Sequence, residues 1–201
     1  MQANIEGYIE SVPSYRALLV FYDVRVTNYR RITRQVRKIL KRLSAETEYK
    51  SRTFRIPVCY GGKYGPDLDA VAAHAGISKE EVIVRHTAPK YLIYMLGFLP
   101  GFAYLGGLDP SLEMPRVSNP RSSIMPGSVG IGGKQTGIYP IASPSGWQLI
   151  GCTPLRLYDP RLSDPILYRP GDYIQFYEIS ETRFQEIEEQ VNNGTYKCEI
   201  V

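Results

Sequence analysis

The sequence predicts a mostly β fold with α+β character, in which a small α/β region precedes a closed or nearly closed β structure. An apolar stripe near the N-terminus has helical spacing, and from Tyr91 onward short strand-like runs alternate with frequent Gly and Pro. The chain has 201 residues, enough for one ordinary domain or two small ones. A polar stretch at 47–53 predicts a linker, and we therefore expect domains at residues 1–50 and 51–201.

The first region is expected to contain two strands and one helix. Residues 5–12 and 15–23 are predicted to be strands on either side of a Pro-Ser turn. Thr27 is expected to cap a helix that runs from Asn28 to about Leu43. The apolar positions with helical spacing are Ile32, Val36, Ile39, Leu40 and Leu43.

The second region is expected to begin with a strand and two short helices. The strand is Thr53–Cys59, and Gly76 is expected to end the first helix. Ser78 and Glu81 form a capping-box pattern for the next one.

The end of the chain shows three further signals. Residues 169–176 are expected to form a turn that enters a strand. Ser180 is expected to cap a last helix that stops near Gly194, and residues 196–201 are expected to return as a terminal strand.

Composition argues against two classes of partner. Lys and Arg number 24 against 20 Asp and Glu, a net charge of +4, and the cations concentrate in residues 30–42. A basic helix face is usually solvated, and no nucleic-acid-binding motif accompanies it. No apolar stretch approaches the length of a membrane span. We therefore expect neither a nucleic acid nor a membrane as partner.

The cysteines argue against a metal or disulfide framework. Cys59, Cys152 and Cys198 are far apart and form no CxxC pair, so no zinc site is expected, and no other metal-ligand cluster is seen. Scattered cysteines in a chain without a signal peptide indicate a cytoplasmic location.

His86 is the clearest catalytic candidate. It ends a predicted short helix just before Thr87, Ala88 and Pro89. Because the free pKa of histidine is about 6.5, such a residue can serve as acid, base or phosphate donor near neutral pH. The alternative is that His86 caps the helix C-terminus by meeting free carbonyls.

The Gly-rich run at 127–133 resembles a phosphate loop only superficially, because no Lys-Ser or Lys-Thr pair opens a helix after it. Its backbone amides can still bind an anion as a nest, with Lys134, Gln135, Arg116 and Arg121 as companions. The alternative is a β-hairpin with tight turns.

Aromatic residues alternate with Gly and Pro from residue 97 to residue 151. Gly permits close backbone approaches and Pro fixes φ, so this composition predicts the wall of a rigid binding surface. It could equally form an interface, since rigid aromatics dominate binding hot spots. The aromatic residues are Phe98, Phe102, Tyr104, Tyr139 and Trp147.

These motifs resemble the family of the 5-oxoprolinase B subunit, also called KipI or allophanate hydrolase subunit 1. The resemblance covers nearly the whole chain and its ordered set of motifs is specific. The matching runs are Val12–Asp23, His86–Pro89, Gly97–Leu105, Pro120–Arg121, Pro126–Val129, Gln135–Pro140, Gly146–Trp147 and Ile150–Gly151.

The resemblance implies a cyclophilin-like β-barrel after the small α/β domain. It also implies two partners: a 5-oxoprolinase C subunit of the KipA or allophanate hydrolase subunit 2 family, and an A subunit of the LamB/YcsF family. With them, relatives open 5-oxoproline to glutamate at the expense of ATP. ATP with Mg is expected at or near an interface between these proteins, and this chain is expected to be inactive alone.

Three other functions are weighed against this one. One family member inhibits a sporulation sensor histidine kinase, which would make the kinase the partner and the aromatic surface its docking face. Similar paired domains form the carboxyltransferase part of urea carboxylase. A prolyl isomerase rests on barrel shape alone, and fold analogy does not carry function.

For the role within an enzyme complex, His86 and Arg121 are the expected catalytic residues. His86 would handle a proton or a phosphate oxygen, while Arg121, Arg116 and Lys134 would neutralise phosphate or carboxylate charge. The expected substrate- and nucleotide-binding residues are Gly97, Phe98, Pro100, Gly101, Phe102, Tyr104, Arg116, Ser128, Lys134, Gln135, Tyr139 and Trp147.

Two departures from the family pattern stand out. Family members usually begin with a further strand and helix ahead of the Val12 run, so the first domain is expected to be incomplete. The usual Pro-Gly-Gly-Trp appears as Pro144–Trp147, and Cys152 stands where an Arg often follows Ile-Gly. The lost Gly and the lost cation are expected to weaken an anion contact placed there.

Overall fold

The computed structural model describes residues 5–15, 17–46 and 51–201. The chain divides into two compact units, Met1–Lys50 and Ser51–Val201, each of which is described by itself. Most of the expected linker, residues 47–50, lies outside the described residues.

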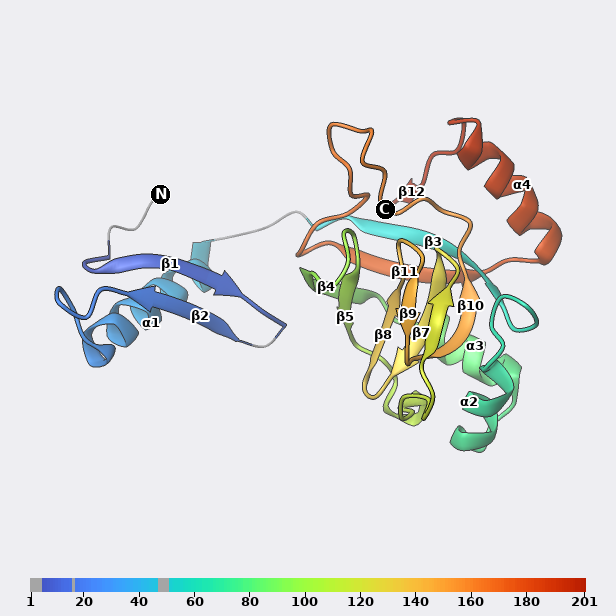
Figure 1. The fold of residues 1–201 in the computed structure, drawn as a ribbon, viewed down its shortest axis with the longest axis horizontal. Coiled ribbons are helices and arrows are strands. Elements are labelled where there is room, and N and C mark those ends of the chain that lie inside the picture. Colours follow the sequence, from blue (N-terminus) through green and yellow to red (C-terminus); the bar gives the residue numbers. More distant parts are fainter. Residues whose placement is uncertain (1–4, 16, 47–50) are drawn as a thin grey trace. The chain divides into compact units, whose positions relative to one another are not determined.

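The first unit consists of a hairpin and a helix (Figure 1). β1 (Tyr8–Pro13) pairs antiparallel with β2 (Leu18–Tyr22), and α1 spans Tyr29–Glu46. In the predicted apolar stripe, Ile32 is buried whereas Leu40 is 52% exposed. The described apolar positions of α1 thus range from buried to exposed.

The N-cap of α1 is Asn28, and the prediction of Thr27 is wrong. The backbone N–H of Arg31 donates to the Asn28 side-chain oxygen at 3.1 Å, the bond expected of an N-cap. Thr27 is buried, and its backbone N–H donates to the carbonyl of Asp23, which keeps it in the turn before the helix.

The second unit is built around one eight-stranded sheet. Its strands are β3 (Thr53–Tyr60), β4 (Tyr91–Leu96), β5 (Ala103–Gly106), β7 (Ser128–Gly132), β8 (Gln135–Ile138), β10 (Gln148–Cys152), β11 (Tyr173–Glu178) and β12 (Glu199–Ile200). The order is β5-β4-β11-β3-β10-β7-β8, and β12 also pairs with β3. The β11–β3 pair is parallel, and the other pairs are antiparallel. A separate pair contains β6 (Arg121–Ile124) and β9 (Ser143–Ser145).

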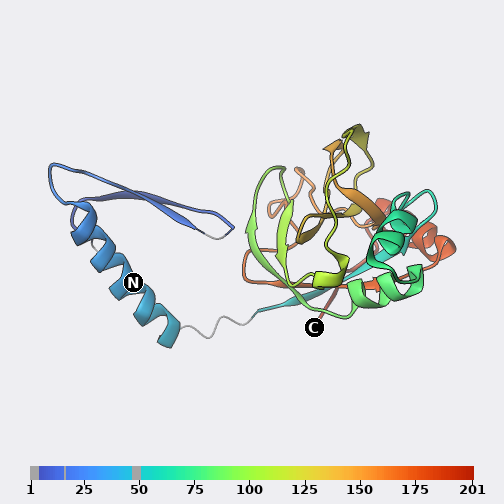
Figure 2. The same ribbon diagram turned by 90° about the horizontal axis from the view of Figure 1, so that it is seen from below.

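The two end strands of this order, β5 and β8, approach each other closely. A Cβ atom placed on Gly137 of β8 would lie only 3.3 Å from the carbonyl oxygen of Ala103 in β5. Figure 2 shows the bent course of β4 and β5, drawn in green. The sheet is therefore a nearly closed barrel, and the mostly β fold class with α+β character is confirmed.

Local signals in the sequence correctly located the helix ends of this unit. Ser78 accepts from the backbone N–H of Glu81, and Ser180 accepts from that of Arg183, each at 3.2 Å. Gly76 ends its helix with a φ of 67°. The helices are α2 (Leu68–Ala75), α3 (Lys79–Thr87), α4 (Glu181–Asn192) and the short 3-10 helix η1 (Pro110–Leu112). Figure 1 shows α4 on one side of β3, and α2 and α3 on the opposite side.

The main core joins the barrel to the helices that pack on it, and its buried residues include Ile56 of β3, Val71 of α2 and Ile187 of α4. Every residue of β7 and β10 is buried. Buried tyrosines need partners for their hydroxyls. Tyr91 donates to the carbonyl of His86 and Tyr168 donates to the carbonyl of Gly101, both at 2.8 Å.

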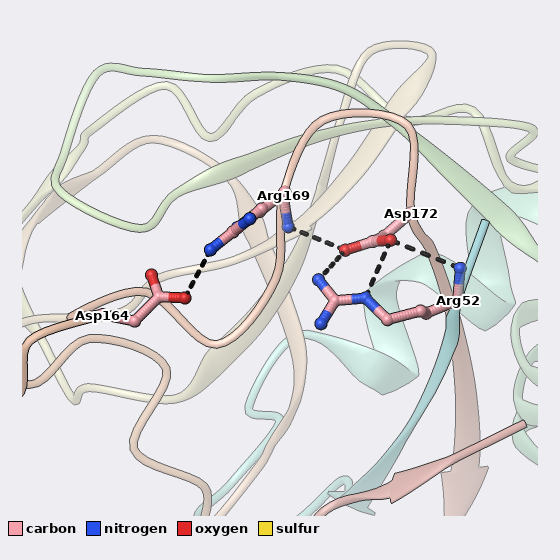
Figure 3. A network of polar contacts seen from close by, with 4 residues as sticks. All are labelled: Arg52, Asp164, Arg169 and Asp172. Atoms are coloured by element: carbon pink, nitrogen blue, oxygen red, sulfur yellow. Dashed lines mark hydrogen bonds and ion pairs between the residues drawn. The ribbon is translucent and has the colours of Figure 1, made fainter. Parts of the chain in front are cut away.

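A buried carboxylate ties the turn before β11 to the start of β3 (Figure 3). Asp172 is 0% exposed and accepts four hydrogen bonds: from the backbone N–H, Nε and Nη2 of Arg52 and from the backbone N–H of Arg169. Burial raises the pKa of Asp172, but these bonds outweigh burial and hold the pKa below its usual value. Gly171, with a φ of 91°, gives the turn the positive φ that a type II turn needs after Pro170.

Asp172→Asn is expected to lower the free energy of unfolding by about 2–4 kcal/mol, because the amide accepts on one oxygen only and turns its NH2 toward donors of Arg52. Urea denaturation at neutral pH measures this change. The matched control is Asp164→Asn, which removes an ion pair to Arg169 in which both side chains are 63% exposed. That control should cost less than about 0.5 kcal/mol, and equal effects would contradict the prediction.

Candidate functional site

A strained turn presents Phe98 at the surface. The N–H of Leu99 donates to the carbonyl of Gly97 at 2.8 Å, and Phe98 between them has a φ of 68°. This is a γ-turn with positive central φ, which bulky residues rarely adopt. The Phe98 side chain is 68% exposed. Backbone strain of this kind clusters at functional sites.

Phe102 lies at the centre of a cluster of aromatic rings. Its centroid is 5.2 Å from those of Tyr104 and Tyr139, 5.7 Å from that of Trp147 and 5.8 Å from that of Phe98. All four contacts are edge-to-face, and such pairs contribute about 0.5–1.5 kcal/mol each beyond area burial. The cluster is therefore a rigid surface.

Glycines of β7 and β8 make room for these rings. A Cβ on Gly132 would lie 2.4 Å from Nε1 of Trp147. A Cβ on Gly137 would lie 3.1 Å from the Phe102 ring and 3.3 Å from the Trp147 ring. Both glycines are needed for space, not for a positive φ.

The Gly-rich run at 127–133 forms the hairpin that we gave as the alternative to an anion nest. β7 pairs with β8 on one side and with β10 on the other. Most backbone N–H groups of the run are therefore engaged in the sheet. Gly133, with a φ of 62°, lies in the turn.

The aromatic cluster lines a pocket of about 240 Å³. We call it the aromatic pocket. It is smaller than the range of about 300–1,000 Å³ typical of sites for drug-sized ligands, and it therefore fits a small one. Its lining residues are Phe98, Phe102, Tyr104, Arg116, Gln135, Tyr139, Pro144, Ser145, Gly146 and Trp147.

Ser145 links the Tyr139 hydroxyl to the backbone of Trp147 at the polar end of this pocket. Its hydroxyl donates to the Tyr139 oxygen at 3.0 Å and accepts from the backbone N–H of Trp147 at 3.1 Å. Burial raises the pKa of Tyr139, while the Ser145 bond and the charge of Arg116 oppose that rise. Arg116 also packs along Gly146, whose added Cβ would lie 3.9 Å from its Cβ and Cδ. The Arg116 guanidinium thus acts on the phenol end of the pocket.

The structure brings together seven of the residues that the sequence predicted for binding. They are Phe98, Phe102, Tyr104, Arg116, Gln135, Tyr139 and Trp147. Gly97, Pro100 and Gly101 do not line the pocket but belong to the loop that carries Phe98 and Phe102. Sequence reasoning missed Ser145, whose only signal was its place just before Gly146 and Trp147.

The other predicted cations are engaged elsewhere. Arg121 pairs with Asp67 at 2.7 Å, and the second carboxylate oxygen of Asp67 accepts from the backbone N–H of Leu149. Lys134 is 82% exposed and lies 3.7 Å from Glu113. Arg116 takes part in none of the ion pairs found among the described residues.

Arg121 and Ser128 line a different cavity, of about 460 Å³. Ser128 is buried there, and its hydroxyl donates to the carbonyl of Met125 at 2.7 Å. Neither residue lines the aromatic pocket. The structure therefore does not bring these two predicted site residues together with the aromatic ones.

His86, predicted to handle a proton or a phosphate oxygen, lies in the core, 0% exposed, and does not line the aromatic pocket. Thr136 donates its hydroxyl proton to the carbonyl of Gly130, so its oxygen accepts from Nε2–H of His86 at 2.8 Å. Nδ1 then accepts from the Tyr60 hydroxyl at 2.7 Å. The ring also stacks on Phe176, with centroids 4.7 Å apart. A neutral imidazole satisfies every partner, and burial lowers its pKa to about 3.

Among the residues that the structure describes, no helix is long and apolar enough to cross a membrane. Within the same residues, no three His, Cys, Asp or Glu side chains gather as ligands for a metal ion.

Gly132→Ala is expected to displace the Trp147 ring and to lower the free energy of unfolding by about 1–3 kcal/mol, because the added methyl overlaps the indole. Tryptophan fluorescence and urea denaturation report the two effects. Gly146→Ala is the matched control, since its Cβ would make contacts no shorter than 3.7 Å. A shift of similar size in both variants would count against this account of the packing.

Stability is expected to fall as the pH drops from about 6.5 toward 3, because the unfolded chain then binds a proton at His86 that the folded chain excludes. One such proton contributes up to about 1.4 kcal/mol per pH unit. His86→Gln cannot take up the proton, so its stability should depend less steeply on pH in that window. Urea denaturation at several pH values between about 7 and 5 measures both slopes, and identical slopes would refute the assignment.

Comparisons with known proteins place the chain among its relatives. The family model described as "Carboxyltransferase domain, subdomain C and D" matches residues 1–168. A protein from Bacillus subtilis (strain 168), named as the B subunit of 5-oxoprolinase, is 45% identical over 196 residues, which cover 92% of this chain and 82% of the relative. One of the same name from Escherichia coli O157:H7 is 53% identical over 138 residues, covering 69% and 63%. The crystal structure of a conserved uncharacterized protein from Pyrococcus horikoshii is 44% identical, with a TM-score of 0.64 and coverage of 88% and 81%.

Proposed function

The chain belongs to the family of 5-oxoprolinase B subunits, and from this premise we propose that it is the B subunit of an ATP-dependent 5-oxoprolinase. In the proposed complex it acts with a C subunit, of the KipA or allophanate hydrolase subunit 2 family, and with an A subunit, of the LamB/YcsF family. The complex opens 5-oxoproline to L-glutamate.

The observation that carries this proposal is the aromatic pocket with a guanidinium at its rim that no carboxylate of the described residues neutralises. A pocket of about 240 Å³ suits a small ring compound, and Arg116 supplies the positive charge that a carboxylate needs. The aromatic walls exclude water from one side of such a ligand, which strengthens electrostatic contacts inside the pocket.

ATP is proposed as the co-substrate because a lactam is a very stable amide. Transfer of the γ-phosphoryl group to the lactam oxygen activates the carbonyl carbon. Attack by water and cleavage of the ring C–N bond then give glutamate, phosphate and ADP. Catalysis of such transfers consists mainly of positioning and charge neutralisation.

The described residues of the aromatic pocket fit the small substrate better than they fit ATP. A triphosphate needs several cations, and neither Arg121 nor Lys134 lines the aromatic pocket. We therefore propose that ATP with Mg binds at or near an interface with a partner protein of the complex. For the same reason the chain alone is proposed to be inactive.

A carboxyltransferase function is the second candidate, because the matching family model carries that description. In that case the pocket would face a carboxylated carrier instead of a phosphorylated lactam. A KipI-like inhibitor of a sensor histidine kinase is the third, and the exposed Phe98 would then be a docking residue.

The proposal is tested by co-expressing the chain with the C and A subunits and measuring glutamate release from 5-oxoproline with and without ATP. Release is expected only with ATP and only from the assembled complex. Phe98→Ala should lower kcat/KM at least about tenfold without loss of assembly, since the exposed ring contributes to the pocket. Leu162→Ala, which removes another exposed apolar side chain, is the control and should leave kcat/KM unchanged.

An assembled complex that releases no glutamate would overturn the proposal. Kinase-binding and carboxyl-transfer assays on the same complex would then separate the two remaining candidates.

A further inference from the structure

We infer that this chain itself holds the 5-oxoproline ring in the aromatic pocket, with Arg116 binding the carboxylate and Gln135 pairing with the lactam amide. The inference deepens the proposed function and rests on it. It assigns the substrate to this chain and makes these two side chains the specificity determinants.

The charge and position of Arg116 make it the partner for the carboxylate of 5-oxoproline. Arg116 lines the pocket, and its charge acts on Tyr139 at the pocket's polar end. It forms none of the ion pairs found in the described part of the chain, and Arg121 and Lys134 do not line the pocket. A guanidinium pairs with a carboxylate through two parallel hydrogen bonds, which fixes the ligand's orientation as well as its charge.

The alternation of side chains along β8 places Gln135 where it can bind the lactam amide of the substrate. Side chains of a strand point alternately to its two faces. Thr136 points to His86 in the core, so Gln135 and Gly137 lie on the opposite face, where Gly137 meets Phe102 and Trp147. The Gln135 backbone is held opposite Gly132 in the β7–β8 ladder.

An amide side chain in that place matches a lactam edge. Gln135 offers one carbonyl acceptor and an NH2 donor, and a lactam offers one N–H donor and one carbonyl acceptor. The two groups can form a pair of hydrogen bonds side by side. Gln135 is half-buried and lines the pocket, so such a pair would be partly shielded from water.

The five-membered ring of the substrate would lie against the aromatic walls, between its carboxylate and its lactam amide. Phe102 and Trp147 are nearly fully buried and packed edge-to-face, so the walls are rigid before the ligand arrives. A preformed wall reduces the ordering cost of binding. The pocket volume of about 240 Å³ favours a single small ring over a nucleotide.

The test is ligand binding to the purified chain. Trp147 is the only tryptophan and lines the pocket, so its fluorescence reports occupancy, and calorimetry gives an independent Kd. Three probes separate the contacts: 5-oxoproline, 2-pyrrolidinone without the carboxylate, and cyclopentanecarboxylate without the lactam. 5-Oxoproline should bind about tenfold or more tightly than either analogue.

Two variants assign the contacts to residues. Arg116→Gln should weaken 5-oxoproline binding about 10- to 100-fold and leave 2-pyrrolidinone binding unchanged. Gln135→Leu should weaken 5-oxoproline binding and leave cyclopentanecarboxylate binding unchanged. Arg183→Gln is the matched control, because Arg183 lies on α4, pairs with Glu186 and does not line the pocket. Urea midpoints of all three variants verify the fold.

The same variants are then measured in the assembled complex. Arg116→Gln should raise KM for 5-oxoproline and leave KM for ATP unchanged. If the isolated chain fails to bind 5-oxoproline while the complex releases glutamate, the inference is wrong and the proposed function stands. If Arg116→Gln weakens all three probes equally, or no more than Arg183→Gln does, the residue assignment is overturned. Binding with the expected pattern but without glutamate release supports the pocket assignment and refutes the proposed function.

Discussion

The close approach of β5 to β8 is the constraint on which the aromatic pocket depends. Gly137 allows this approach, because any side chain there would meet the Ala103 carbonyl and the rings of Phe102 and Trp147. Gly132 performs the same task for the indole from the neighbouring strand. Because these glycines lack side chains, Gly137 lets the barrel close, and both Gly132 and Gly137 leave room for the rings of the pocket wall. The packing of the fold and that of the pocket therefore depend on the same glycines.

One strand serves two environments because its side chains alternate. Thr136 points into the core and binds His86, which in turn receives the Tyr60 hydroxyl. Gln135 and Gly137, on the other face, border the aromatic pocket. The bond to the buried imidazole thus holds the Thr136 side chain on the core face of the strand that carries Gln135. The contact of Thr136 with His86 and the position of Gln135 at the pocket follow from a single pattern of alternation.

Charge pairing distinguishes Arg116 from the other arginines of the second unit discussed above. Arg52 is committed to the buried Asp172, and Arg121 to Asp67, whose other oxygen holds a backbone N–H of β10. These pairs tie segments together that are far apart in the sequence. Arg116 sits instead among aromatic rings without a carboxylate from the described residues, so its field is directed at the pocket. The electrostatics of the pocket therefore depend both on the lack of a carboxylate beside Arg116 among the described residues and on the aromatic rings around it.

Features that depend on neighbouring residues could be predicted from the sequence: the caps at Ser78 and Ser180, the turn before β11, the mostly β class and the clustering of aromatic residues with Gly. Each follows from the backbone preferences or spacing of a short segment. Three other features emerged with the folded structure: His86 is buried, Arg116 has no carboxylate partner among the described residues, and Ser145 lines the pocket. Those outcomes depend on contacts between distant segments, such as Asp67 with Arg121 and Thr136 with His86. A residue's type states which contacts it can form, but burial and pairing are set by which segments the folded chain brings beside it.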